Sequence, residues 1–383
     1  MIPLSAPEIR GNEWKYVKEC LDTGWVSSVG SFVDRFEQEV AAYVGVPHAV
    51  AVMNGTAALH VGLQAIGLQP GEEVLVPTLT FIAPVNAIRY CGAFPVFVDA
   101  HPDSWQIDPE KVAQFLRQEC VEREGHCYNR RSGRLIRAIL PVHILGLACD
   151  MDRLVELARG YGLQVVEDAA EAMGVRYRGS HVGTFGDIGI FSFNGNKIIT
   201  TGGGGILVTH DAKKADYARY LSTQAKDDAL EYIHQEVGYN YRLTNLQAAV
   251  GVAQLEQLQA FIVKKRAIAD AYKSALGTID GLTLMPAPPG CETTYWLYTV
   301  LLGEGTTLEQ RKEVIARLRG AGIEARPFWH PVHALAPYRH CQAYQIEHAD
   351  RLYERGVSLP SSVGLTEAQL DHCVAEFRRC LTP

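Results

Sequence analysis

One lysine, Lys197, lies in the segment FSFNGNKIITTGGGG (191–205), between an alternating apolar run and four consecutive glycines. A lysine buried away from water gives up its proton more readily and can act as a Schiff-base nucleophile. The glycines let the backbone pass close to a flat group or adopt a positive φ. Because they follow the lysine instead of preceding it, the segment is not a phosphate-binding P-loop. Taken alone, it is better explained by a solvated lysine in a turn.

A second segment, NGTAAL at 54–59, places Gly55 and Thr56 where an apolar run ends and a helical pattern begins. The free N–H groups and the positive dipole end of a helix start bind anions such as phosphate. An ordinary helix cap is the alternative, since Asn and Thr both cap helices well.

Two carboxylates follow another apolar run, in VVEDAAE at 165–171. Asp168 falls at the end of a predicted buried strand, where an unpaired carboxylate is costly and needs a cationic partner such as a pyridinium nitrogen. Glu171 comes three residues later, so a helical turn would turn it to the same side. The spacing is equally consistent with Asp168 as a cap that opens a helix.

The three segments gain meaning together, because ligands of open α/β sheets bind at the C-terminal ends of the strands. A phosphate site, a carboxylate for a ring nitrogen and a Schiff-base lysine are the parts that a pyridoxal 5'-phosphate (PLP) enzyme requires. We therefore expect PLP to be bound through Lys197.

The elements that must position these residues form an α/β pattern. Several apolar runs in the first 250 residues are β-branched, as buried parallel strands are, and they alternate with amphipathic segments. This order predicts a mainly parallel sheet with helices on both faces. We predict strands over 48–55, 73–78, 94–100, 136–146, 163–170, 188–193 and 205–209, and helices over 56–67, 83–91 and 151–161.

A smaller second domain is expected after this alternation. A proline-free helical pattern over 243–275 predicts a bridging helix, and the Pro/Gly-rich MPAPPG at 285–290 indicates a nearby boundary. We divide the chain into a large domain, 1–250, and a small α+β domain, 251–383. The small domain has a predicted strand over 296–302 and helices over 307–320 and 366–379. The polar residues 119–135 are interpreted as a surface insertion.

Composition excludes several classes of protein. The net charge of −7 argues against nucleic-acid binding. The chain has neither an apolar run of membrane-spanning length nor a secretory signal pattern, so we expect a cytoplasmic protein without a membrane partner. Nine cysteines without a CxxC pair are interpreted as reduced thiols, and the absence of an HExxH or Cys/His cluster predicts no structural metal.

Ordered motifs along the whole chain resemble one family, the DegT-type sugar-nucleotide aminotransferases. This family has the aspartate-aminotransferase fold, which is fold type I of the PLP enzymes. The likeness is greatest to the 4-aminotransferases of bacillosamine and legionaminic acid synthesis, through the start of the chain, TQAKDD at 223 and the insertion near 125. The motifs that carry the family resemblance are GTAAL at 55, PTLTFIAPVNAI at 77, EDAAEAMG at 167, SFNGNKIITTGGGG at 192, GYNYRLTNLQAAVG at 238 and IEARPFWHPVH at 323.

The resemblance implies roles for the cofactor-site residues. Lys197 would be the Schiff-base lysine and later the proton shuttle, and Asp168 would pair with the pyridine nitrogen. Glu171 stands next to the ring hydroxyl, where many relatives carry glutamine, so it must be protonated or find a donor. The cofactor contacts implied are ring stacking by Phe81, phosphate binding by Gly55, Thr56 and Ser192, and a further phosphate contact from the partner subunit of a homodimer by Asn240 or Arg242.

The resemblance implies the substrate side less directly. The TGWVSSVG segment at 23–30, with Trp25 and Ser27, is expected to line the sugar-nucleotide site together with Arg326. Arg326 could pair with the carboxylate of glutamate or with the nucleotide diphosphate. His330 and His333 are either ligand contacts or structural residues.

The function implied is a ping-pong transamination. L-glutamate would supply the amino group for C4 of a nucleotide-linked 4-keto-6-deoxy sugar, with UDP-2-acetamido-2,6-dideoxy-hexos-4-ulose as the expected acceptor. A GDP- or dTDP-linked acceptor of the perosamine type is the alternative. Three other functions fit less well: a sugar dehydratase would carry histidine at Lys197, a non-catalytic regulator would not need Lys197 and Asp168, and a nicotinamide enzyme would need GxGxxG where NGTAAL stands.

Overall fold

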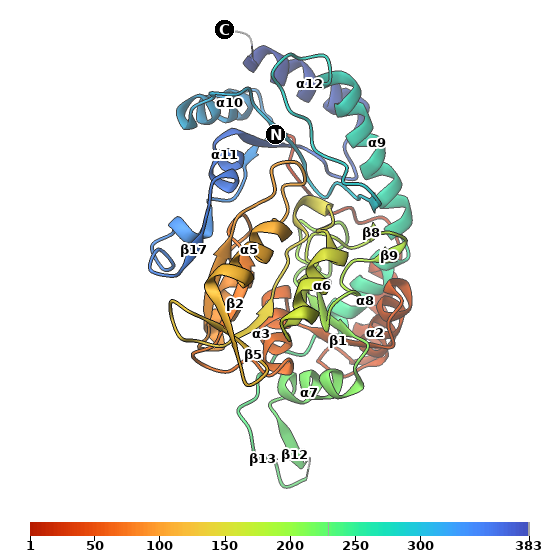
Figure 1. Ribbon diagram of the computed structural model, residues 1–383. Helices are drawn as coiled ribbons and strands as arrows, with labels where there is room; N and C mark the ends of the chain where they lie inside the picture. The colour runs from red at the N-terminus through yellow and green to blue at the C-terminus, as the bar shows by residue number, and fades with distance from the viewer. Residues whose placement is uncertain (229, 382–383) are drawn as a thin grey trace.

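An eight-stranded sheet forms the centre of the computed structural model, which describes residues 1–228 and 230–381 (Figure 1). All neighbouring strands are parallel except β11, which is antiparallel to both β1 and β10. The predicted mainly parallel α/β sheet is therefore confirmed. In spatial order the strands are β1 (His48–Val52), β11 (Gly205–Thr209), β10 (Ile188–Ser192), β7 (Gln164–Asp168), β6 (Ile136–Ile139), β2 (Glu73–Pro77), β3 (Phe94–Val98) and β17 (Ala343–Tyr344).

Helices cover both faces of this sheet, because alternate side chains of each strand enter different cores. On β2, Val74 and Val76 enter one core with α3 and α4, whereas Leu75 enters the other with α2, α5 and α6. Of these helices, the sequence analysis did not predict α2, α5 and α7. The helices on the two faces are α2 (Ser31–Val44), α3 (Gly55–Ala65), α4 (Ala83–Tyr90), α5 (Pro109–Glu119), α6 (Met151–Gly160) and α7 (Ala212–Ser222).

Two predicted elements are shorter or divided. The strand predicted over 136–146 ends at Ile139, because Pro141 has no N–H to donate and residues 144–146 form a 3-10 turn. The helix predicted over 243–275 is two helices, α8 (Asn245–Leu255) and α9 (Leu258–Leu276). The break lies where the Gln257 N–H donates to the carbonyl of Gln254 at 3.0 Å, three residues back instead of four.

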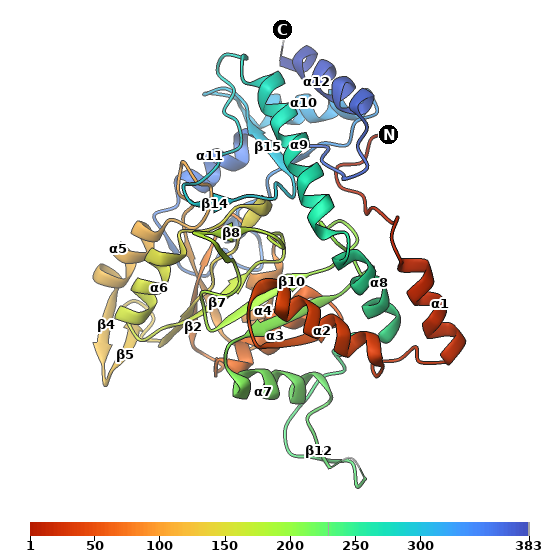
Figure 2. The ribbon, with the colours of Figure 1, turned by 90° about the vertical axis from the view of Figure 1, so that its right-hand side faces the viewer.

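The C-terminal part stacks three helices around a small antiparallel sheet, with α9 rising from α8 beside it (Figure 2). Contacts with the N-terminal half tie this part to the rest of the chain: β17 extends the large sheet beyond β3, and Ile2 forms a parallel bridge with Ile323. The division into 1–250 and 251–383 stays a prediction. The elements here are β15 (Tyr298–Leu301), α10 (Leu308–Gly320), β16 (Arg326–Pro327), α11 (His348–Arg355), β18 (Gly356–Leu359) and α12 (Glu367–Leu381).

The segment interpreted as a surface insertion, 119–135, is partly a packed element. It forms a β-hairpin in which Cys120, Cys127 and Asn129 are buried. Asn129 Nδ2 donates to the buried Glu73 at 2.7 Å and so ties the hairpin to the large sheet. All nine cysteines are free thiols. The remaining elements are α1 (Glu13–Thr23), β4 (Cys120–Arg123), β5 (His126–Asn129), β8 (Arg176–Tyr177), β9 (Ser180–His181), β12 (Lys226–Asp228), β13 (Ile233–His234), β14 (Cys291–Glu292) and the 3-10 turns Ile144–Gly146 and Val332–Ala334.

Within the described residues, none of the helices combines the length and the apolar character needed to cross a membrane.

Candidate active site

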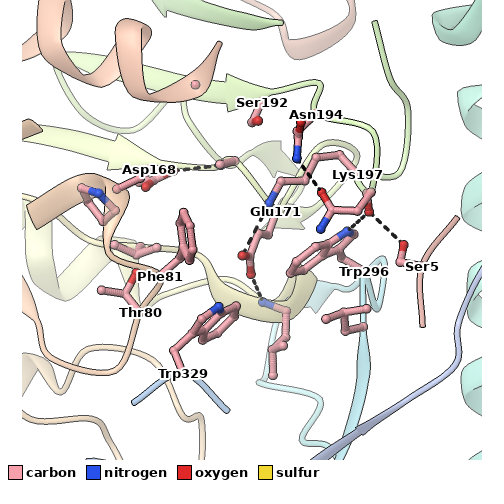
Figure 3. Close-up of a pocket in the computed structure, with 18 of the residues that line it drawn as sticks. Ser5, Thr80, Phe81, Asp168, Glu171, Ser192, Asn194, Lys197, Trp296 and Trp329 are labelled. Carbon is pink, nitrogen blue, oxygen red and sulfur yellow. Dashed lines mark hydrogen bonds and ion pairs between the residues drawn. The ribbon is translucent and has the colours of Figure 1, made fainter. Parts of the chain in front are cut away.

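A cavity of about 430 Å³ opens at the C-terminal ends of β1, β7 and β10 (Figure 3). It is the place where the three chemistry-bearing segments meet, as expected for a parallel sheet. The residues predicted for the site that line the cavity are Gly55, Thr56, Phe81, Asp168, Glu171, Ser192, Lys197 and Arg326.

Lys197 lies in a turn but is enclosed, with a side chain that is 13% exposed. Its Nζ is 3.6 Å from Glu171 Oε1 and 4.1 Å from the ring centroid of Trp296. The alternative of a solvated turn lysine is therefore wrong. The amine has a carboxyl on one side and an aromatic face on the other (Figure 3).

Glu171 reaches the cavity from a series of turns, not from the helical turn expected from the three-residue spacing. Its Oε2 accepts the N–H of Leu145 at 2.8 Å, and Leu145 holds a positive φ of 62°. Burial raises the pKa of Glu171 to about 7, against the opposing effect of Lys197. The carboxyl can therefore gain or lose a proton near neutral pH, which answers how a glutamate is accommodated beside the lysine.

Asp168 ends β7 and is 3% exposed. Its Oδ1 accepts the N–H of Ala170 at 3.0 Å, and no helix begins there, so the helix-cap alternative is wrong. Burial raises the pKa of Asp168, while the Ala170 N–H and the charge of Lys197 lower it. A cation placed in the cavity beside this carboxylate would be stabilised by it.

His143, which the sequence analysis did not single out, contacts the backbone of Asp168. Its backbone N–H donates to the carbonyl of Asp168 at 2.9 Å, and its Nε2 lies 3.0 Å from Glu167 Oε2. Because Nδ1 accepts the N–H of Cys149 at 3.1 Å, the ring proton is on Nε2. Glu167 thus fixes the orientation of the His143 ring next to the end of β7.

The start of α3 provides an anion-binding cradle. Asn54 caps the helix by accepting the N–H of Ala57 at 2.8 Å, so the cap explanation of this segment holds. That bond leaves the N–H groups of Gly55 and Thr56 in the first helical turn without an intrahelical acceptor. The two explanations are therefore compatible: Asn54 caps the helix, and its first turn can still bind an anion.

Glycines allow the strand ends around this cradle to pack closely. A Cβ at Gly55 would lie 2.9 Å from Ser192 Cβ, and one at Gly205 would lie 2.4 Å from the carbonyl carbon of Asn54. Gly202 has a positive φ of 83°. Within the four-glycine run, close approach explains Gly205 and backbone conformation explains Gly202.

The donors and acceptors around the cavity fit PLP. In the cavity wall, the Thr80 hydroxyl is buried and has no hydrogen-bond partner among the described residues, so a ligand group can satisfy it. Asp168 is placed to receive a protonated ring nitrogen, and Phe81, which is 55% exposed, offers an aromatic face to the cavity.

Sequence reasoning missed a second set of cavity residues. Ser5 Oγ and Trp296 Nε1 both donate to the carbonyl of Asn196, at 2.8 and 2.7 Å. Trp329 also lines the cavity, one residue before His330 in a motif that was recognised only as a family likeness. Trp296 falls within the strand predicted over 296–302, where an aromatic residue gives no separate signal.

Two predicted substrate residues and one predicted phosphate contact lie away from this cavity, although the structure describes all three. Trp25 is 57% exposed in the connection between α1 and α2, where Asn245 binds the carbonyls of Trp25 and Ser27. Asn240 is exposed. Its alternative, Arg242, is held in its own chain by an ion pair with Glu37 at 2.7 Å.

The two histidines of the 323–333 motif, both described, also lie outside the cavity lining. His333 Nδ1 is 2.8 Å from Thr78 Oγ1, at the end of β2, and burial lowers its pKa. The ring of His330 packs 4.9 Å from that of Tyr353. These contacts favour the structural alternative for both residues.

Comparison with known proteins places this geometry in a family. Residues 7–378 match the DegT/DnrJ/EryC1/StrS aminotransferase family. The GDP-perosamine synthase of Caulobacter vibrioides is 42% identical over 382 residues, which are 99% of this chain and 98% of that protein. EpsN of Bacillus subtilis, described as a putative pyridoxal phosphate-dependent aminotransferase, is 40% identical over 96% of this chain and 92% of its own.

A solved structure has the same fold. The aminotransferase TlmJ from Streptoalloteichus hindustanus superposes with a TM-score of 0.90 at 29% identity, covering 100% of this chain and 99% of its own. The likeness to fold type I is therefore confirmed, and the enzyme is a PLP-dependent aminotransferase that acts on a nucleotide-linked sugar. The chain belongs to the DegT/DnrJ/EryC1/StrS aminotransferase family.

Proposed function

We propose that the enzyme transfers the amino group of L-glutamate to C4 of a GDP-linked 4-keto-6-deoxy sugar, giving a GDP-4-amino sugar of the perosamine type. The enclosed Lys197, between Glu171 and Trp296, is the observation that carries the chemistry. The full-length similarity to a GDP-perosamine synthase favours the GDP-linked alternative over the UDP-linked acceptor expected from the motifs. The UDP-linked sugar is the second candidate.

The residues of the cavity divide the work. PLP supplies an electron sink when it is bound at Lys197. In this proposal the first N–H groups of α3 hold the phosphate, and Asp168 keeps the ring nitrogen protonated. The amine of Lys197 moves the proton between the reacting carbon atoms. Glu171, 3.6 Å away and able to titrate near neutral pH, sets the charge around that amine.

Arg326 is the proposed anchor for an anionic substrate group. It lines the cavity with a side chain that is 59% exposed, and its Nε and Nη2 donate to Glu324 Oε1 at 3.2 and 2.7 Å. Its other N–H groups can bind the carboxylate of glutamate or the diphosphate of the sugar nucleotide. Trp329 provides an apolar part of the cavity wall.

A homodimer with shared active sites remains part of the proposal. The hairpin β12–β13 projects from the body below α7 (Figure 1), and apolar residues on and after it are exposed. Exposed apolar side chains on a projection favour a second chain as their cover. Asn240, exposed just beyond this hairpin, is preferred to the ion-paired Arg242 as the group that reaches the partner's site. The exposed residues are Leu230, Tyr232, Ile233 and Val237.

The test compares acceptors on the PLP-loaded enzyme. L-glutamate should bleach the visible absorbance band and yield 2-oxoglutarate, and the band should return when a GDP-4-keto-6-deoxy sugar is added. We expect kcat/KM for the GDP-linked sugar to exceed that for the UDP-linked one, with the amino sugar identified by mass spectrometry. The reverse preference would select the second candidate, and Lys197→Ala retaining turnover would refute the mechanism itself.

A further inference from the structure

A second lysine, Lys265, is buried within α9 and is 2% exposed. Its Nζ donates to the carbonyl of Trp296 at 2.7 Å and to that of Ser361 at 2.5 Å. In the described part of the chain no acidic side chain forms an ion pair with it, and burial lowers its pKa to about 7. An isolated buried ammonium is costly, so an apolar residue would be the simpler choice for packing alone.

The carbonyls of Trp296 and Ser361 explain why this buried position carries a lysine. Each belongs to buried irregular backbone, where an unsatisfied acceptor costs free energy. A neutral lysine amine still has two N–H groups, one for each carbonyl, and so it satisfies both without carrying a charge. An arginine stays charged in proteins and lacks this option.

The segments joined by Lys265 form the wall behind Lys197. Trp296 is held at three points: its carbonyl binds Lys265, its Nε1 donates to the Asn196 carbonyl, and its ring lies 4.1 Å from Lys197 Nζ. On the other segment, the Ser361 N–H donates to the carbonyl of Leu4 at 2.9 Å. The next residue, Ser5, binds the same Asn196 carbonyl.

The loop that carries Glu171's donor is pressed against the same wall. A Cβ at Gly146 would lie 2.6 Å from the Trp296 nitrogen, and the preceding residue, Leu145, supplies the N–H that binds Glu171. A shift of the Trp296 backbone would therefore reach both neighbours of the Lys197 amine.

We propose that Lys265 is a positioning residue for Lys197, acting through Trp296. Its two hydrogen bonds join α9, the residues before β15 and the residues after β18, and so fix the aromatic face on which the Lys197 amine rests. The inference rests on the role of Lys197 given under the proposed function.

The test uses the PLP-loaded enzyme and the variant Lys265→Met, which keeps an unbranched side chain one atom shorter and removes its donors. The matched control is Lys264→Met, one position away on the less buried side of α9. The primary readout is the pH midpoint of the visible absorbance band. The second is the separate measurement of kcat and KM with L-glutamate.

We expect the proton affinity reported by the band to change about fivefold in Lys265→Met, the equivalent of one net hydrogen bond. We expect kcat to fall by about tenfold or more with KM little changed, because the lysine is misplaced while substrate contacts remain. Lys264→Met should match the unchanged enzyme. In a Trp296→Ala background, Lys265→Met should add no further shift of the midpoint.

An unchanged midpoint and kcat in folded Lys265→Met would overturn the proposal. So would an equal shift in the Trp296→Ala background, because Lys265 would then act by another route. If Lys265→Met does not fold, Lys265→Gln, whose N–H donors end one atom short of the Nζ position, should shift the midpoint and kcat in the same direction but less, and unchanged values would overturn the proposal. Loss of activity in Lys265→Met cannot be confused with failure of the proposed function, which is decided by Lys197→Ala.

Discussion

Replacing Glu171 by glutamine should stabilise the cofactor-free protein in a pH-dependent way. Burial raises the pKa of this carboxyl from 4.5 to about 7 in the folded protein. Between these two pH values the folded state holds a proton that the unfolded chain has released. The folded protein therefore loses stability as the pH rises through this window, and the loss is complete above pH 7.

The magnitude follows from the change in pKa. Each pKa unit corresponds to about 1.4 kcal/mol, so the ionised carboxylate costs roughly 3 kcal/mol above pH 7. Glutamine has nearly the same shape as the protonated glutamate, and its amide oxygen can accept the Leu145 N–H in the same way. Glu171→Gln should thus raise the free energy of unfolding by about 3 kcal/mol at pH 8 and change it little at pH 4.5.

Urea denaturation without added PLP measures this difference, because bound cofactor would contribute its own stabilisation. The matched control is Glu354→Gln, an exposed glutamate on α11, which should change the free energy of unfolding by less than about 0.5 kcal/mol at either pH. An equal gain at both pH values would refute the reasoning, since burial of a titrating carboxylate would not be its cause. The absence of any gain at pH 8 would refute it as well.

Two further substitutions test the packing around the cavity. Gly205→Ala places a Cβ 2.4 Å from the Asn54 carbonyl carbon and should lower the free energy of unfolding by about 1–3 kcal/mol while weakening PLP binding. Gly203→Ala, with no atom within 4 Å of the new Cβ, is its control; equal PLP affinity in the two variants would contradict the steric argument. Arg242→Met leaves the buried Glu37 with Arg219 as its remaining ion-pair partner. It should lower the free energy of unfolding, measured by urea denaturation, by about 3 kcal/mol. A variant as stable as the unchanged protein, but defective in PLP binding, would instead favour Arg242 as the residue that reaches the partner's site.

The part of the cavity that the sequence predicts is the part built on the ends of parallel strands. Asp168 and Ser192 end β7 and β10, and Gly55 follows β1, so one rule about strand ends brings them together with Lys197. The periodicity of apolar residues predicts those strands without knowledge of any distant contact.

The residues missed in the cavity depend on distant packing. Ser5 and Trp296 meet at one carbonyl, that of Asn196, although they are far apart in the chain. No local pattern distinguishes a tryptophan that faces a cavity from one that fills a core. The protonation of Glu171 likewise depends on burial by segments remote in sequence, and its residue type alone does not determine it.

Among the helices, the misses have different causes. The starts of α5 and α7 carry ordinary signals, an aspartate cap at Asp108 followed by Pro109 and another cap at Asp211, which the sequence analysis did not use. The break between α8 and α9 has no such signal. It occurs where Glu256 accepts hydrogen bonds from Asn12, Tyr16 and Arg35, and no proline or glycine marks it.

The strand β17 has a consequence for the synthesis of the protein. It completes the edge of the large sheet beside β3, but β3 ends at Val98 and β17 begins only at Ala343. At ordinary rates of translation the ribosome needs on the order of ten to fifty seconds to make the intervening chain. During that time the nascent protein carries an unpaired strand edge, the kind of surface on which another chain can add a strand. A growing chain can therefore become protected at this edge only after Ala343 and Tyr344 have been made.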